Sequence, residues 1–305
     1  MEKHRKKLIK NAAVFDGHSS GLAQGKKIVI EDDIVTEITA DEVSEENFDE
    51  VFDGTGMVAM PGMTDAHVHM GCLFAKGEFP VDYATVLTVA KCKDALMAGF
   101  TTFRDAGSVS EGLKLAFDEG VLPGPRIYPC GAYISQTCGH GDSEYAHTYR
   151  DIQYRHPSST VLADGVPEII WAVREQFYRG ASHIKLMATE ILNRHEDIRL
   201  LFGTDMMITG PDYQVEQSED IRYYEKRFGT MRALRALTGT ANEVFALTTY
   251  QNPYPKGKIG VLEAGAYADL LLVDGDPTKR VSVLADTDHL RLIMKGGTVY
   301  KNTLC

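Results

Sequence analysis

The stretch MPGMTDAHVHMG, residues 60–71, decides the fold, because it predicts a strand that ends in a loop. His67 and His69 stand at positions i and i+2 near the end of this strand. Their side chains therefore project from the same face and can converge on one metal ion. In a chain with ten histidines, the alternative is a chance pair of solvated or hydrogen-bonded imidazoles. The position at a strand end favours the metal, because active sites of β/α-barrels lie where strands end.

Strand and helix patterns alternate on the C-terminal side of this stretch. Such an alternation predicts a parallel sheet covered by helices. We expect strands over residues 60–71, 100–107, 126–135, 183–189 and 198–205, and helices over residues 81–99, 109–120, 166–180 and 218–239.

The two ends of the chain have a different pattern. Short segments rich in Val and Ile, bounded by Gly, Asp or Asn, predict β-strands both before and after the alternating region. Gly296 and Gly297 indicate a hairpin near the C-terminus. We therefore expect one discontinuous β-sandwich domain made of residues 1–59 and 255–305, and a β/α domain over residues 60–254.

Composition excludes several classes of function. The net charge of -11 over 305 residues argues against nucleic-acid binding, which needs clustered Lys and Arg. Neither a signal peptide nor a bilayer-spanning apolar run is evident, so we expect a cytoplasmic protein without a membrane partner. No CxxC pair occurs, which favours reduced thiols over a zinc knuckle or redox motif for Cys72, Cys92, Cys130, Cys138 and Cys305.

Several further stretches support a family resemblance. After residues 60–71 the chain continues with FTTFRDAG, CGHGD, ADGVPEIIWAVREQ, HIKLMAT, LLFGTD and GAYADLLLVDGDP. In this order they resemble the metal-dependent amidohydrolase superfamily, and most of all its imidazolonepropionase-like and prolidase-like members. The resemblance touches nearly the whole chain. It implies an α/β fold, a (β/α) TIM-type barrel, with a small β-sandwich formed by both chain ends.

The resemblance also implies a reaction and a ligand set. It predicts a hydrolase of amide, cyclic amide or dipeptide bonds, acting on a small molecule such as an acylated amino acid or dipeptide. His67 and His69 would bind the more buried metal, a carboxylated Lys185 would bridge two metals, and Asp205 would bind metal and act as general base and then acid. One or two Zn²⁺ ions fit these ligands, and manganese, iron or cobalt are not excluded. Outside this family, Lys185 would be a surface lysine and Asp205 an Asx turn.

Other polar residues near the predicted strand ends are less specific. His140 lies in the glycine-rich GHGD loop, where it can contact substrate and assist catalysis or simply be solvated. Arg104 and Asp105 can bind a substrate carboxylate or pair with each other, and we favour the pair. His183 shares a face with Lys185 and is interpreted as structural.

The spacing of the motifs departs from the family pattern. About 118 residues separate His67 from Lys185, which suits strands one to four at roughly thirty residues per βα-unit. Only 20 residues separate Lys185 from Asp205, where four more strands should begin. We therefore predict an internal deletion of barrel strands 5 to 7, with a seam near Glu190 and Ile191. It removes two metal-binding histidines that the family normally has.

Two consequences follow from the predicted deletion. An incomplete barrel leaves an unpaired sheet edge, so a homo-oligomer is possible. His195 lies just past the seam and could replace a missing ligand, although a solvated histidine is favoured there. The first hypothesis is thus a zinc-dependent amidohydrolase. The second is a degenerate homologue, impaired in catalysis, that acts as a subunit or binds a ligand.

Overall fold

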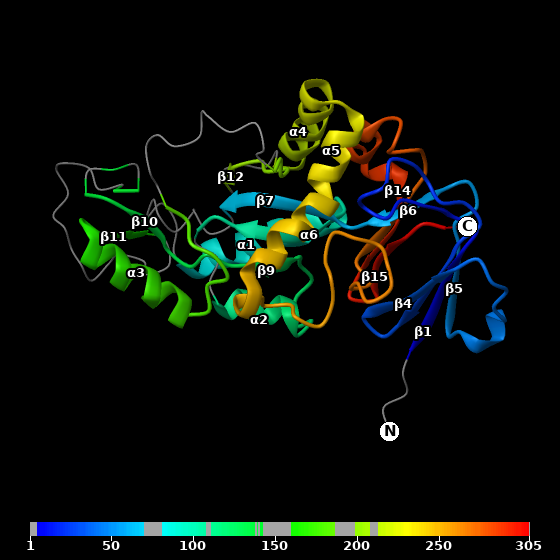
Figure 1. Ribbon diagram of the computed structural model, residues 1–305, viewed down its shortest axis with the longest axis horizontal. Coiled ribbons are helices and arrows are strands. Elements are labelled where there is room, and N and C mark those ends of the chain that lie inside the picture. Colours follow the sequence, from blue (N-terminus) through cyan, green and yellow to red (C-terminus); the bar gives the residue numbers. More distant parts are fainter. Residues whose placement is uncertain are drawn as a thin grey trace.

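The computed structural model describes residues 5–69, 81–107, 111–137, 139, 141–142, 160–186, 199–207 and 213–304. Figure 1 shows two parts side by side: a parallel sheet with helices, and the β-strands of both chain ends. Residues His140, Glu190, Ile191 and His195, which were singled out in the sequence, lie outside the described residues.

The α/β part is built on a parallel sheet with the strand order β12-β7-β8-β9. Its strands are β7 (Met63–His69), β8 (Phe100–Asp105), β9 (Arg126–Tyr128) and β12 (Met206–Met207). The last of these strands along the chain pairs with the first, as the first and last strands of a barrel do. The strand and helix alternation thus forms the parallel sheet that the sequence predicts.

The predicted third strand over residues 126–135 is divided in two. Its first half is β9, which pairs with β8, whereas its second half, β10 (Tyr133–Ser135), pairs with β11 (Thr160–Leu162). The predicted fourth strand is described as far as Leu186, which forms a single parallel bridge with Ile134. Within the described residues, these strands do not close into a barrel.

Six α-helices are described around these strands. They are α1 (Val81–Met97), α2 (Glu111–Asp118), α3 (Val166–Tyr178), α4 (Tyr213–Phe228), α5 (Thr230–Leu237) and α6 (Gly239–Phe245). The predicted helix over residues 218–239 is interrupted because Gly229 adopts a positive φ of 80° between α4 and α5. None of the described helices is long and apolar enough to span a bilayer.

The core of the α/β part lies between the parallel sheet and these helices. Phe100 and Phe103 on β8 are fully buried with Phe202, whose ring stacks on that of Phe100 at 5.8 Å between centroids. Cys92 and Leu96 of α1 and several residues of α5 belong to the same cluster. Burial of this apolar surface holds the segment around residue 202 against the sheet.

The strands of the two chain ends form two further sheets. One contains β1 (Lys6–Lys10), β3 (Lys27–Glu31), β4 (Ile34–Thr39) and β5 (Glu50–Asp53) in the order β4-β3-β1-β5. The other has the order β15-β14-β13-β6-β2 and contains β2 (Ala13–Val14), β6 (Val58–Pro61), β13 (Leu270–Val273), β14 (Leu290–Lys295) and β15 (Thr298–Asn302). Short 3-10 helices cover Glu45–Asn47, Ala246–Gln251, Val281–Ala285 and Thr287–His289.

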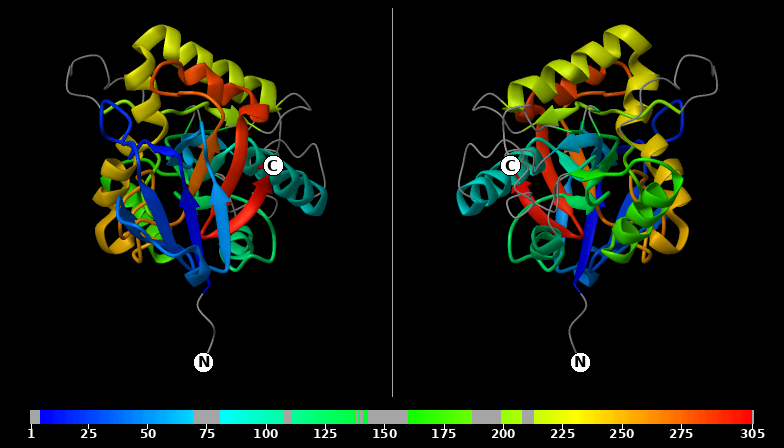
Figure 2. Two further views of the ribbon diagram at one scale, coloured as in Figure 1. Left: turned by 90° about the vertical axis from the view of Figure 1, so that its right-hand side faces the viewer. Right: turned by 90° about the vertical axis from the view of Figure 1, so that its left-hand side faces the viewer.

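Strands from both chain ends are hydrogen-bonded to each other within the second sheet. β6 pairs antiparallel with β13, and Figure 2 shows the blue and red strands of the two ends close together. Ile28 and Val35 of the first sheet share one buried cluster with Leu270 and Leu292 of the second. The hairpin expected at Gly296 and Gly297 is confirmed: both residues have a positive φ and join β14 to β15.

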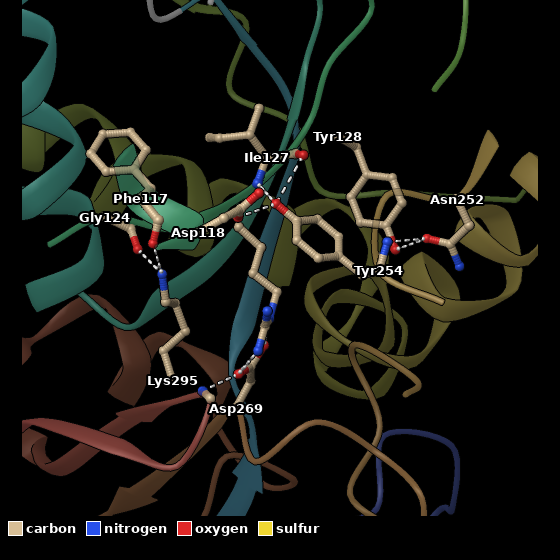
Figure 3. Close-up of polar contacts among 11 residues, drawn as sticks. Phe117, Asp118, Gly124, Ile127, Tyr128, Asn252, Tyr254, Asp269 and Lys295 are labelled. Atoms are coloured by element: carbon tan, nitrogen blue, oxygen red, sulfur yellow. Dashed lines mark hydrogen bonds and ion pairs between the residues drawn. The ribbon is translucent and has the colours of Figure 1, made fainter. Parts of the chain in front are cut away.

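A buried polar network connects these strands to the α/β part (Figure 3). The guanidinium of Arg126 on β9 donates two hydrogen bonds to Asp269, from Nε to Oδ2 at 2.7 Å and from Nη2 to Oδ1 at 3.2 Å. The Tyr254 hydroxyl donates to Asp118 Oδ1 and accepts from the Ile127 N–H, both at 2.8 Å. Lys295 donates from Nζ to the carbonyl oxygen of Gly124 at 2.5 Å. Charged and polar groups from distant parts of the chain thus satisfy their hydrogen-bonding needs inside the molecule.

We expect Asp269→Asn to lower the free energy of unfolding by about 3–5 kcal/mol, because it leaves the buried Arg126 guanidinium without its counter-charge. Urea unfolding followed by circular dichroism measures the loss. The matched control is Glu243→Gln, which breaks the exposed ion pair with Arg199 and should cost less than about 1 kcal/mol. Equal losses in the two variants would contradict the role given to Asp269.

Lys295 predicts a pH dependence of stability. Burial lowers the pKa of this lysine to about 8, although the Asp269 carboxylate opposes the shift. Between pH 8 and the unfolded-state pKa of about 10.4, the unfolded chain holds a proton that the folded chain has lost, so stability rises with pH. Over this pH interval, we expect the free energy of unfolding of wild type to rise by roughly 3 kcal/mol relative to that of Lys295→Met. Below pH 7, the difference between the two proteins should stay constant. Urea midpoints of both proteins at several pH values test this, and parallel pH curves would contradict it.

Candidate metal centre

Three side chains that could hold a metal ion meet at the carboxyl end of β7. His67 and His69 lie on this strand, and Asp205 immediately precedes β12, which pairs with it. Asp205 Oδ1 lies 3.2 Å from His67 Nε2 and 3.4 Å from His69 Nε2. The three ligand atoms all lie within 4.8 Å of one another. The i and i+2 spacing therefore brings the two imidazoles together, and the adjacent segment supplies a carboxylate.

The spacing of these atoms suits a divalent metal. Zn²⁺ binds His nitrogen and carboxylate oxygen at about 2.0–2.2 Å, which places neighbouring ligands of a tetrahedral site roughly 3.4 Å apart. Both distances from Asp205 are close to that separation. Two imidazoles and one carboxylate suit zinc, and they also suit manganese, iron or cobalt.

Lys185 lies beside the same group of ligands. Its Nζ is 3.1 Å from His67 Nε2, although 118 residues separate the two in the chain. Burial, and next the positive charge of Lys185, lowers the pKa of His67 to about 4. The imidazole of His67 is therefore neutral at pH 7, which is the form that binds metals. All four residues that the sequence suggested as ligands are thus neighbours in the structure.

The segment that carries Asp205 is only partly regular. The sequence predicts a strand over residues 198–205, but the regular strand β12 begins at Met206. Asp205 adopts a φ of +54°, in the left-handed region that a strand does not use, so the strand cannot extend through it. Hydrogen bonds from Ala66 N to Phe202 O at 2.8 Å and from Asp205 N to His67 O at 2.9 Å still hold the segment against β7.

A second carboxylate, Asp65, lies beneath the metal ligands and was not singled out in the sequence. It is fully buried and accepts hydrogen bonds from Thr204 and Gln217. Burial raises the pKa of Asp65 to about 7, and these hydrogen bonds oppose the rise. Its position two residues before His67 places it on the same strand face, which is the one sequence signal that could have indicated it.

The expected ion pair between Arg104 and Asp105 is wrong. Successive residues of β8 point to opposite sides of the strand, so the two side chains separate. Arg104 donates from Nη1 to Ala66 O at 3.4 Å, whereas Asp105 Oδ2 accepts from the Gly107 N–H. His183 contacts the Ser182 hydroxyl at 3.0 Å and is not one of the three clustered metal-binding candidates.

Comparisons with known proteins relate part of the chain to a family of hydrolases. The model of the amidohydrolase family matches residues 58–198. Ochratoxinase from Aspergillus niger is 34% identical over 152 residues, which are 43% of this chain and 31% of that protein. Imidazolonepropionase from Picrophilus torridus is 39% identical over 176 residues, which are 53% of this chain and 43% of that protein. The chain thus matches less than half the length of these curated relatives.

Solved structures resemble the chain over nearly its whole length. An amidohydrolase has a TM-score of 0.84 at 23% identity, and the alignment covers 98% of this chain and 100% of the other. A prolidase complexed with N-methylphosphonate-L-proline has a TM-score of 0.83 at 22% identity, with coverage of 97% and 100%. These similarities show a TIM-barrel-type α/β fold. The chain is therefore similar to the amidohydrolase family over residues 58–198, and imidazolonepropionase and prolidase-like proteins are among the proteins that it resembles.

We expect purified protein equilibrated with Zn²⁺ and then desalted to retain at least one equivalent, because three ligand atoms already have a suitable spacing. His67→Ala should lose this metal. His18→Ala, which alters an exposed histidine, should keep it. Elemental analysis and competition with a chromophoric chelator measure both. Metal-free wild type, or equal retention by His67→Ala and wild type, would contradict the centre.

Proposed function

We propose that this protein is a metal-dependent hydrolase of carbon-nitrogen bonds in a small molecule. The observation that carries the proposal is the convergence of His67, His69 and Asp205, with Lys185 beside them. The family match and the hydrolases among the relatives support the same class of reaction. An acylated amino acid, a cyclic amide or a dipeptide is the proposed substrate.

The proposed ligands are His67, His69, Asp205 and Lys185. Zinc is the proposed metal. An amine of Lys185 would be a poor ligand, so we propose that it is carboxylated, which supplies anionic oxygens. Burial lowers the pKa of Lys185, against the effect of the Asp205 carboxylate, and a lowered pKa favours the neutral amine that reacts with carbon dioxide. One bound metal ion is the simplest occupancy for these four residues. A carbamate on Lys185 that bridges two metal ions would allow a second ion to bind.

Asp205 is the proposed proton carrier of the reaction. When bound, a divalent metal would lower the pKa of water and polarise the substrate carbonyl. The Asp205 side chain is 76% exposed, whereas that of His69 is 7% exposed, so Asp205 is the member of the group that faces solvent and incoming substrate. Its carboxylate can accept the proton of the attacking water and then deliver it to the leaving nitrogen.

Arg104 supports a substrate that carries a carboxylate. In the described part of the chain its guanidinium forms no ion pair, and its hydrogen bond to Ala66 O is long at 3.4 Å. Its charge contributes to lowering the pKa of His67, which places it near the metal ligands. Arg104 is partly buried, and a partly buried cation without a counter-charge is unfavourable, so a substrate anion would stabilise it. Acylated amino acids and dipeptides both offer a carboxylate.

The fold that we propose for this enzyme is an incomplete barrel. The pairing of β12 with β7 and the short interval between Lys185 and Asp205 support the loss of barrel strands 5 to 7. We also propose that the two sheets of the chain ends form the β-sandwich domain of residues 1–59 and 255–305, since they share one buried cluster. The β/α domain then spans residues 60–254.

We expect the zinc-loaded protein to hydrolyse at least one member of a panel of N-acyl amino acids and dipeptides ending in proline. Asp205→Asn should lower kcat by about 100-fold or more, because the amide cannot carry the proton. Asp41→Asn is the control, since Asp41 is an exposed aspartate of the N-terminal part of the chain. A ninhydrin or chromatographic assay for the released amine measures the rates.

Full activity in Asp205→Asn would contradict the role of Asp205 as proton carrier. Tight zinc binding without any hydrolysis would favour the alternative, a degenerate homologue that acts as a subunit or binds a ligand.

A further inference from the structure

Asp65 connects the two segments that carry the candidate metal ligands. It lies on β7, two residues before His67, and its side chain is fully buried. Its Oδ1 accepts the backbone N–H of His67 at 3.2 Å and that of Thr204 at 3.3 Å. Its Oδ2 accepts the Thr204 hydroxyl at 2.8 Å. One carboxylate thus binds the backbone of a histidine ligand and the residue next to the aspartate ligand.

The contacts between Asp65 and Thr204 restrain the neighbouring residue Asp205, whose backbone conformation is unfavourable. Asp205 has a φ of +54°, a conformation that costs a non-glycine residue of the order of 1 kcal/mol, so other contacts must hold it. Thr204 is held through both its backbone N–H and its hydroxyl, and the Asp205 N–H donates to His67 O at 2.9 Å. Two of these bonds hold Thr204, and the third holds the N–H of the peptide that joins Thr204 to Asp205. The backbone that carries the Asp205 side chain is therefore restrained up to its own N–H.

A third element reaches the same carboxylate without carrying a ligand. Gln217 of α4 is 1% exposed and donates from Nε2 to Asp65 Oδ2 at 3.3 Å. This contact attaches α4 to the sheet, so its loss should affect stability. Within the described residues, no hydrogen bond joins Gln217 to Thr204 or Asp205. The chain therefore offers an internal comparison between two hydrogen bonds that end on the same oxygen atom.

From these contacts we infer that Asp65 is a positioning residue, which holds Asp205 at metal-binding distance from His67 and His69 through Thr204. The inference rests on the proposed function, because it assigns Asp65 a part in forming the metal centre. Residues that orient metal ligands typically change metal affinity by about 10–100-fold when they are removed. Asp65 would act before any substrate binds.

The decisive comparison is between Thr204→Val and Gln217→Leu. Each removes one hydrogen bond to Asp65 Oδ2 with little change in volume. We expect Thr204→Val to weaken Zn²⁺ binding by at least about 10-fold, and Gln217→Leu to leave it within about 3-fold of wild type. Chelator competition at 25 °C gives the affinities, and the d–d absorption of Co²⁺-loaded protein reports a changed ligand geometry. Equal affinities in both variants would overturn the inference.

Substitutions of Asp65 itself provide a graded test. Asp65→Ala removes every acceptor and should weaken Zn²⁺ binding by about 100-fold. Asp65→Asn keeps one oxygen for the two backbone N–H groups and should recover at least part of that loss. If Asp65→Ala does not fold, Thr204→Val still provides the test. Wild-type affinity in a folded Asp65→Ala protein would overturn the inference.

Amide hydrogen exchange in metal-free protein separates this inference from the proposed function. The Asp205 N–H is hydrogen-bonded to His67 O, so its exchange rate reports whether the residue is held. We expect Thr204→Val to speed exchange at Asp205 by at least about 10-fold more than Gln217→Leu does, whether or not the wild type binds metal. Absence of metal binding in wild type would sink the proposed function alone. Unchanged exchange at Asp205 in Thr204→Val would sink the positioning role alone.

Discussion

The candidate site depends on the backbone pairing between β7 and the segment that ends in β12. Ala66 N donates to Phe202 O and Asp205 N donates to His67 O, which sets the register of two segments about 138 residues apart. Because ligand atoms must lie about 2.0–2.2 Å from a zinc ion, a slip of one residue would turn Asp205 away from the histidines. The buried ring of Phe202, stacked on Phe100, stabilises this register with apolar contacts.

The polar network around Arg126 has a comparable role between the chain ends and the α/β part. Arg126 and Asp269 are 143 residues apart, and the Arg126 guanidinium also lies 3.8 Å from the Tyr267 ring centroid. A buried ion pair gains little net energy over apolar packing, but it tolerates few alternative arrangements. This pair, with Lys295 on the carbonyl of Gly124, fixes how the end strands meet β9. The strands of the chain ends therefore have a defined position against the β9 edge of the parallel sheet.

Local patterns in the sequence predicted what depends on local geometry. The period of two along β7 placed His67 and His69 together, and paired glycines marked the β14–β15 hairpin. Lys185 and Asp205 came from family resemblance, because nothing local shows that they approach His67. The break between β9 and β10, and the separation of Arg104 from Asp105, depend on which strands pair. Asp65 was missed for the same reason: its hydroxyl partner, Thr204, lies 139 residues further along the chain.

The exposure of the ligands indicates from which side the centre is reached. His69 is almost fully buried and Asp205 is mostly exposed, so the group is covered by β7 and its neighbours and open beyond Asp205. In a complete barrel, strands that precede the last one would stand next to that segment. Only 20 residues separate Lys185 from Asp205 in the sequence. An open side lowers the desolvation of a bound substrate, which weakens electrostatic effects. Restraint of Asp205 by the protein itself, through Thr204 and Asp65, matters more at such an exposed position.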